Sequence, residues 1–305
     1  MQLRRLFTAV LASAALLLGG CAGGDDAATD SPSPSAGSAY PVTVGKLTLP
    51  QRPERIVSLS PTATEMLFAI GAGPQVTAVD EASSFPADAP RTDLSGFKPN
   101  AEAIAAKNPD LVVLSDDLNK IVDQLGALKI PVFLTPSATD LDQAYAEIEQ
   151  LGQLTGHTGE ATALTGRMRT DIDSIAASVP KRTKPVTYYY ELDPTLYTVT
   201  SKTFVGSVLA RLGLQNVADS ADPDGSKGDY PQLSQEALVK GNPELILLAD
   251  TKCCKQSAAT VNARTGWSSI TAVKTGQIVA LDDDIASRWG PRVVDLMRSV
   301  ADALA

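Results

Sequence analysis

One phrase of this chain occurs twice, and the repetition restricts the folds open to it. Residues 100–114 read NAEAIAAKNPDLVVL, and residues 234–248 read SQEALVKGNPELILL. Six of the fifteen positions are identical, and most of the others exchange one aliphatic residue for another or Asp for Glu. Each copy reads as a short helix ended by Asn-Pro and followed by an apolar run typical of a buried strand. The same α/β unit is therefore expected twice.

Short aliphatic runs alternate with longer amphipathic stretches in both halves of the chain. This alternation is typical of βαβ units and of a mainly parallel sheet, so the fold class is α/β with two lobes. Strands are expected at residues 56–59, 76–79, 111–114, 132–134, 186–191, 245–248 and 278–281, and helices at 62–70, 100–107, 118–128, 205–212, 236–240 and 291–304.

A long amphipathic helix is expected between the two halves. Asp140 begins one helix and Gly156 interrupts it; apolar residues then recur at steps of three and four from Ala161 to Val179, until Pro180 ends the pattern. At ~1.5 Å per residue the second helix is a rod of roughly 30 Å, and a single rod permits only small relative motion of two lobes. The expected boundaries are an N-terminal lobe at 50–156, a linking helix at 157–180 and a C-terminal lobe at 184–305.

The first 20 residues read as an export signal. Arg4 and Arg5 precede an apolar run that is too short to span a bilayer as a permanent helix. The run ends in LGGC, which resembles the bacterial lipobox and implies cleavage before Cys21 and a lipid on that residue. An ordinary signal peptide with a chance cysteine is the alternative. Residues 21–45 are then a lipidated, flexible linker, and the protein is expected on the outer face of the cell membrane.

Charge and histidine content exclude several classes of protein. A net charge of −9 argues against a nucleic-acid partner. The single histidine, His157, rules out a metal site with several His ligands and leaves a Ser–His or Cys–His mechanism without a base. Gly71-Ala72-Gly73 lacks the third glycine of a dinucleotide fingerprint. Neither an enzyme nor a resident metal or cofactor is expected.

Two cysteines remain once Cys21 is assigned to the lipid. Cys253 and Cys254 are neighbours in sequence, so a bridge between them distorts the intervening peptide. A strained vicinal disulfide and a pair of free or mixed thiols stay open as alternatives.

Four segments, in this order, resemble the solute-binding proteins of bacterial ABC importers for iron chelates and vitamin B12: RIVSLSPTATEMLFAIGAG, NAEAIAAKNPDLVVL, YPQLSQEALVKGNPELILL and SRWGPRVVDL. The resemblance implies two Rossmann-like lobes joined by one rigid helix, with the ligand in the cleft between them. It also implies a monomer that delivers a corrinoid or ferric siderophore, carrying its own cobalt or iron, to a permease dimer and its ATPase. Haem is the alternative cargo.

The repeated phrase acquires a function from this resemblance. In the family an acidic residue near the tip of each lobe meets arginines of the permease, and the matching positions here are Glu102 and Glu236. The plain alternative is helix electrostatics, because a carboxylate near a helix N-terminus contributes ~0.3–1 kcal/mol by itself.

Ligand-binding residues are expected in the turns that follow strands, because ligands of open α/β folds bind at the carboxyl ends of the strands. The likeness to the B12 binder around SLSPTATE and YPQLSQE implies cleft roles for the aromatic and arginine positions among them. Tyr188 and Tyr189 are expected to pack inside, and the run Asp282–Asp284 to form a solvated turn. The predicted ligand-binding residues are Ser60, Pro61, Thr62, Phe97, Tyr190, Tyr230, Arg288 and Trp289.

Overall fold

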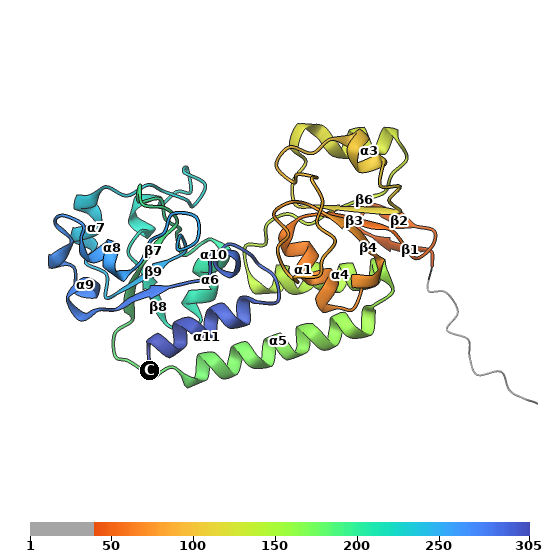
Figure 1. The fold of residues 1–305 in the computed structure, drawn as a ribbon. Coiled ribbons are helices and arrows are strands. Elements are labelled where there is room, and N and C mark those ends of the chain that lie inside the picture. The colour runs from red at the N-terminus through yellow and green to blue at the C-terminus, as the bar shows by residue number, and fades with distance from the viewer. Residues whose placement is uncertain (1–39) are drawn as a thin grey trace, which may run out of the picture. The chain divides into compact units, whose positions relative to one another are not determined.

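The computed structural model describes residues 40–305, which form two α/β lobes (Figure 1). The predicted signal, Cys21 and most of the predicted linker lie outside the described residues. Within residues 40–305, no helix is both long enough and apolar enough to cross a membrane.

The first described segment corrects the predicted end of the linker at residue 45. β1 (Val42–Val44) pairs antiparallel with β2 (Leu47–Leu49), and Gly45 takes a φ of 57° in the two-residue turn between them. Val44 and Leu49 are buried in the core. This hairpin alternates apolar residues with Thr and therefore already belongs to the folded lobe.

The N-terminal lobe is built on a parallel sheet with the strand order β4–β3–β5–β6. The predicted helix at 118–128 begins only at residue 121, because Asn119 and Lys120 have left-handed backbone conformations. The strands are β3 (Ile56–Leu59), β4 (Val76–Val79), β5 (Leu111–Leu114) and β6 (Val132–Leu134), and the helices are α1 (Pro61–Ala69), η1 (Gly73–Gln75), α2 (Ala101–Ala105), η2 (Leu118–Lys120), α3 (Ile121–Ala127) and α4 (Leu141–Thr155).

The C-terminal lobe repeats the design with a parallel sheet in the order β10–β9–β7–β8. Its last helix begins at Val293, two residues after the Pro291 predicted to open it. The strands are β7 (Val186–Glu191), β8 (Leu214–Asn216), β9 (Leu245–Leu248) and β10 (Ile278–Ala280), and the helices are α6 (Phe204–Ala210), η3 (Asp219–Ala221), α7 (Gln235–Gly241), α8 (Ala258–Asn262), η4 (Trp267–Ser269), α9 (Thr271–Thr275), α10 (Asp283–Ala286) and α11 (Val293–Ala303).

The repeated phrase folds the same way in both lobes. Asn100 accepts a hydrogen bond from Ala103 N and caps α2, and Ser234 accepts one from Ala237 N and caps α7. The asparagine of each Asn-Pro pair has a positive φ that turns the chain out of the helix: 51° at residue 108 and 44° at residue 242.

The acidic residue that precedes the strand in each copy of the phrase also has the same role in both lobes. Asp110 Oδ2 accepts from the backbone N–H of Glu54 and of Arg55, just before β3, at 3.0 Å each. Glu244 Oε2 accepts from the N–H of Thr187 in β7 at 3.2 Å. Each carboxylate thus fixes the phrase to the central strand of its own sheet.

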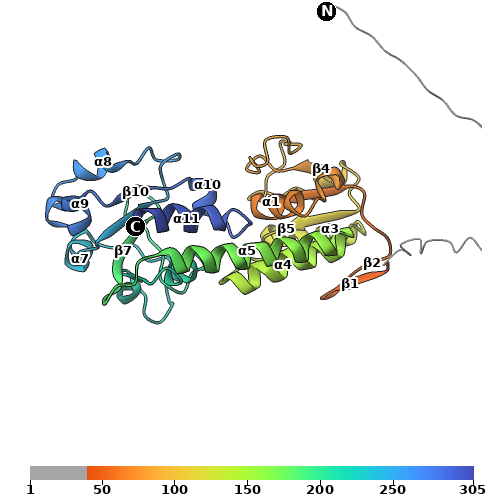
Figure 2. The ribbon, with the colours of Figure 1, turned by 90° about the horizontal axis from the view of Figure 1, so that it is seen from below.

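The linking helix α5 (Thr158–Ser178) lies beside α4 and α11 (Figure 2). Its buried residues recur at steps of four, three and four: Ala161, Thr165, Met168 and Ile172. One hydrophobic cluster runs through this stripe and includes residues from the inner helices of both lobes. The lobes therefore share a continuous core along α5, in addition to the outer core that each keeps to itself.

Buried polar contacts also join the lobes. Glu65 of α1 is 2% exposed; it accepts from Arg288 at 2.6 Å and from Arg292 at 2.5 and 2.9 Å. Removing one partner from such a buried ion pair leaves an uncompensated charge and costs ~3–5 kcal/mol. Next to it, Trp289 Nε1 donates to Glu147 Oε2 of α4 at 2.8 Å.

The burial of Glu147 makes stability depend on pH. Burial raises the pKa of Glu147 from 4.5 to about 7, and the bond from Trp289 opposes the rise. Between these values the folded protein holds a proton that the unfolded chain has released, so stability falls as pH rises from 4.5 to 7, by on the order of 3 kcal/mol. We expect Glu147→Gln, which keeps an acceptor for Trp289, to remove this loss. Urea unfolding at pH 5 and pH 8 measures it.

The matched control for that experiment is Glu149→Gln on the same helix, which should leave the pH dependence of the wild type in place. An unchanged difference between pH 5 and pH 8 in Glu147→Gln would contradict the assignment.

Candidate ligand-binding cleft

A cavity of about 470 Å³ lies at the carboxyl ends of the N-terminal lobe's strands. Loops that follow β3, β4, β5 and β6 supply most of its wall, and residues 287–289 of the C-terminal lobe supply the rest. Its lining residues are Leu59, Ser60, Pro61, Thr62, Asp80, Ala82, Gly96, Phe97, Leu114, Ser115, Asp116, Leu118, Ser137, Ser287, Arg288 and Trp289. The position is the one expected for a ligand site in an open α/β fold.

Six of the eight predicted ligand-binding residues lie in this lining, and whether they bind a ligand stays a prediction. Phe97 is 75% exposed, so its ring is available to a ligand at the cavity wall. The six are Ser60, Pro61, Thr62, Phe97, Arg288 and Trp289.

Tyr190 was predicted to face the cleft, and the structure contradicts this placement. Its side chain is fully buried, and its hydroxyl donates to the carbonyl oxygen of Ala286 at 2.8 Å. Burial raises the pKa of this hydroxyl well above its ordinary value. β7 is a central strand covered on both faces, so Tyr190 packs inside together with Tyr188 and Tyr189, the two that were expected there.

Tyr230 lies outside the cavity lining. It sits in the loop before α7 with 51% of its surface exposed, directly after Asp229, whose φ is 66°. Its hydroxyl has a raised pKa, caused by partial burial and by the neighbouring Asp229 carboxylate.

The floor of the cavity is a network of hydroxyl groups. Ser60 Oγ accepts from Ala63 N at 3.2 Å and so caps α1, while Ser115 Oγ donates to Ser60 Oγ at 2.5 Å. Below them Thr64 bonds to Ser58 at 2.9 Å and to Ser83 at 3.0 Å. Pro61 occupies the first turn of α1, where its missing N–H costs nothing. These contacts hold the SLSPTATE turn in one conformation.

Arg288, the arginine carried over from the resemblance, already has protein partners. Besides Glu65 it donates to the carbonyl oxygen of Ala82 and to Asp284 Oδ1, both at 3.2 Å. Only 10% of its side chain is exposed. Its charge is therefore largely balanced before any ligand arrives.

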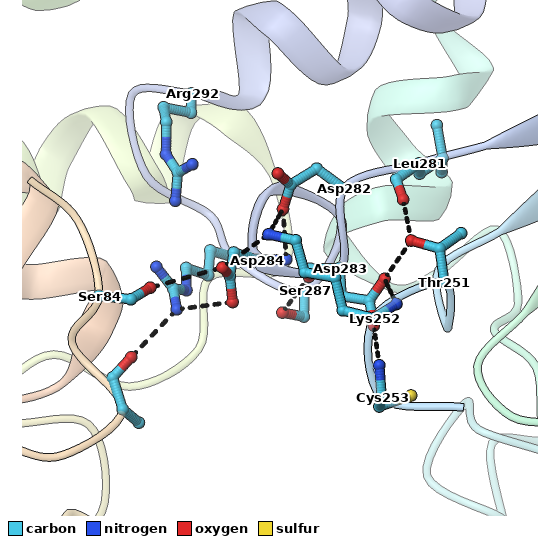
Figure 3. Close-up of polar contacts among 12 residues, drawn as sticks. Ser84, Thr251, Lys252, Cys253, Leu281, Asp282, Asp283, Asp284, Ser287 and Arg292 are labelled. Carbon is cyan, nitrogen blue, oxygen red and sulfur yellow. Dashed lines mark hydrogen bonds and ion pairs between the residues drawn. The ribbon is translucent and has the colours of Figure 1, made fainter. Parts of the chain in front are cut away.

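The run Asp282–Asp284 was expected to be a solvated turn. Its side chains are exposed or half-buried, but the run begins α10 and also anchors a neighbouring loop (Figure 3). Lys252 Nζ contacts Asp282 at 2.6 Å and Asp284 at 2.9 Å. The backbone N–H groups of Lys252 and Cys253 each donate to Asp283 Oδ2 at 2.9 Å. The three carboxylates thus hold the loop after β9 against the loop that carries Arg288 and Trp289.

Both cysteines of that loop are free thiols in the structure. Their Sγ atoms are 2.7 Å apart, and Cys253 is exposed. Local desolvation of the sulfur, the Cys254 thiol and Asp283 together raise the pKa of Cys253 to about 12. The Cys253 thiol is therefore a poor nucleophile at neutral pH.

Glu102 and Glu236 occupy equivalent exposed positions in the first turns of α2 and α7. Neither glutamate is among the residues that line the cavity.

Sequence reasoning missed several polar residues of the cavity, chiefly Asp80, Ser115 and Asp116. Asp80 and Ser115 directly follow a strand and Asp116 is the next residue, so the rule that located Ser60 applies to them as well. Single polar residues carry no periodic pattern, and that is why they were not singled out.

The chain is similar to known substrate-binding proteins in both sequence and structure. Over its whole length the chain is 30% identical to an uncharacterized ABC transporter substrate-binding lipoprotein, YvrC, of Bacillus subtilis, of which the match covers 98%. It is 32% identical to a cobalamin-binding protein of Halobacterium salinarum, over 84% of this chain and 71% of that protein. The structure of the periplasmic vitamin B12-binding protein BtuF of Vibrio cholerae matches with a TM-score of 0.68 at 25% identity, over 83% of this chain and 96% of that one.

The family described as periplasmic binding protein matches residues 56–285. That stretch contains both four-stranded sheets and the helix α5 that joins them. The chain belongs to the periplasmic binding protein family.

Proposed function

We propose that this substrate-binding protein captures a corrinoid outside the cytoplasm and delivers it to the permease and ATPase of an ABC importer. The observation that carries the proposal is the cavity of about 470 Å³, built by loops of one lobe and closed by Arg288 and Trp289 of the other. A corrinoid is larger than this volume, so the cavity holds one part of it and the remainder reaches out past Phe97.

The ligand class is supported by two relatives that bind cobalamin by name, one in sequence and one in structure. The exposed ring of Phe97 and the indole of Trp289 offer flat apolar contacts to a macrocycle. Ferric siderophores and haem are the competing cargoes. In each case the cargo carries its own metal, and we propose that the protein holds no resident cofactor and performs no catalysis.

Delivery is proposed to use Glu102 and Glu236. A protein with two lobes that docks on two copies of a permease needs one equivalent contact per lobe, and these are the exposed carboxylates that both copies of the repeated phrase place alike. Exposed ion pairs contribute little affinity individually, but they steer the encounter and fix its register. The protein is expected to act as a monomer held to the membrane by the lipid on Cys21.

Cyanocobalamin should quench the fluorescence of Trp289 in the purified protein. Trp289 lines the cavity, whereas the second tryptophan, Trp267, is 2% exposed within the C-terminal lobe. We expect saturable quenching at submicromolar ligand after correction for the ligand's absorbance. Trp289→Phe should lose that signal and keep the emission of Trp267. If haemin or a ferric siderophore saturates the response and cyanocobalamin gives none, the corrinoid assignment is wrong.

Reversing both docking charges should separate binding from transport. Glu102→Lys combined with Glu236→Lys is expected to leave cyanocobalamin affinity unchanged, because both side chains are exposed, and to abolish uptake of labelled cobalamin by cells. Asp171→Lys combined with Asp302→Lys makes the same change in net charge at exposed sites on α5 and α11, and should transport normally. Normal uptake by the glutamate double variant would exclude the docking role.

Membrane attachment is tested at Cys21. Cys21→Ser should move the exported protein from the membrane fraction to the soluble fraction, because the acyl chains that hold it are lost. Fractionation followed by immunoblotting measures the distribution. Retention of the variant in the membrane would show that something other than this cysteine anchors the chain.

A further inference from the structure

Asp80 is a buried carboxyl group in the wall of the cavity. It is the first residue after β4, its side chain is 1% exposed, and it lines the cavity together with Gly96 and Arg288. Within residues 40–305, Asp80 Oδ1 has no hydrogen-bond partner. Leaving a buried acceptor unpaired costs free energy, so nearly all such atoms in folded proteins have a partner. An unpaired acceptor beside a ligand cavity indicates a donor that the ligand brings.

The surroundings of Asp80 hold its carboxyl group in place. Its backbone N–H donates to Ser58 O at 3.1 Å, and its carbonyl oxygen accepts from Ser83 N at 3.3 Å. Gly96 packs directly on the carboxylate, because a Cβ there would lie 2.9 Å from Asp80 Oδ2 and 2.6 Å from Leu59 O. Rearrangement of the side chain to find another partner is therefore sterically restricted.

The charge of the cavity wall favours some cargoes over others. Asp80 and Asp116 are the acidic lining residues, and Arg288 is the basic one. Arg288 is already bound to Glu65 and Asp284. Burial raises the pKa of Asp80, while the neighbouring Ser83 and the charge of Arg288 oppose that rise. In a cavity with apolar walls such charges act on a ligand more strongly than they do in water.

We infer that Asp80 is a specificity-determining residue that accepts a hydrogen bond from an N–H group of a neutral or cationic cargo and disfavours cargo that presents carboxylates. The inference rests on the proposed function, since it concerns the ligand of the same cavity. Corrinoids fit it, because their rim carries primary carboxamides, each with two N–H donors. Haem fits it poorly, because its rim carries two carboxylates.

The test compares ligands that differ in one group. Cyanocobalamin and its isomeric monocarboxylic acids, in which one rim amide is replaced by a carboxylate, are titrated into the purified protein. We expect the wild type to bind at least one acid about tenfold more weakly than the amide, and Asp80→Asn to abolish that difference while weakening the amide. Asp116→Asn, an equal change of charge at an exposed lining residue, should keep the difference.

Equal discrimination in the wild type and in a folded Asp80→Asn variant would overturn the inference. Gly96→Ala is the second variant: its Cβ meets Asp80 Oδ2, so it should also reduce discrimination with the charge intact. Urea unfolding confirms that both variants fold.

A second pair of ligands tests the role of Asp80 even if the proposed corrinoid function is wrong. If the wild type binds no corrinoid, haemin and its neutral dimethyl ester form the second ligand pair. The inference then expects the ester to bind about tenfold more tightly than haemin, and Asp80→Asn to remove that preference. A wild type that prefers the dicarboxylate would overturn the role of Asp80.

Discussion

The shared core along α5 is the constraint on which the rest of the structure depends. The buried stripe of this helix packs on α4 from one lobe and α11 from the other, and the hydrophobic cluster is continuous across it. Separating the lobes by a wide rotation would expose this apolar surface to water. The same rotation would draw Arg288 and Arg292 away from Glu65, which is 2% exposed, and leave a buried charge without a partner. Both effects oppose large opening.

A fixed relation between the lobes determines how the cavity can work. One lobe supplies most of the wall as four loops at the ends of parallel strands, and the other adds a short segment that ends in Trp289. Arg288 and Trp289 of that segment are bound to Glu65 and Glu147 of the other lobe. The chain just before the segment is held by the contacts of Lys252 with the carboxylates of residues 282 and 284. Binding is therefore expected to involve side chains and small loop shifts rather than closure of a hinge.

Most of the fold was predictable because it depends on local patterns. The bounds of β3, β4, β5, β6, β7 and β9 agree with the sequence, since aliphatic runs between polar turns specify buried parallel strands. β8 was missed because it is a three-residue edge strand with an exposed Gln215. Tyr190 was misplaced because burial on both faces of a central strand depends on helices far away in sequence. The ion pairs of Asp282 and Asp284 with Lys252 likewise join residues some 30 positions apart.

The repeated phrase shows which of its side chains the fold itself requires. In both lobes its first residue caps a helix, and the asparagine of its Asn-Pro pair supplies a left-handed turn. The acidic residue after that pair binds the backbone at the start of the central strand. The first acid is different. Across residues 40–305, neither Glu102 nor Glu236 has a side-chain hydrogen bond or an ion pair. Helix electrostatics accounts for an acid in a first turn, but an Asp would serve as well there. Two glutamates of the same length, exposed at matching points of both lobes, support the proposal that they dock on a partner with two equivalent subunits.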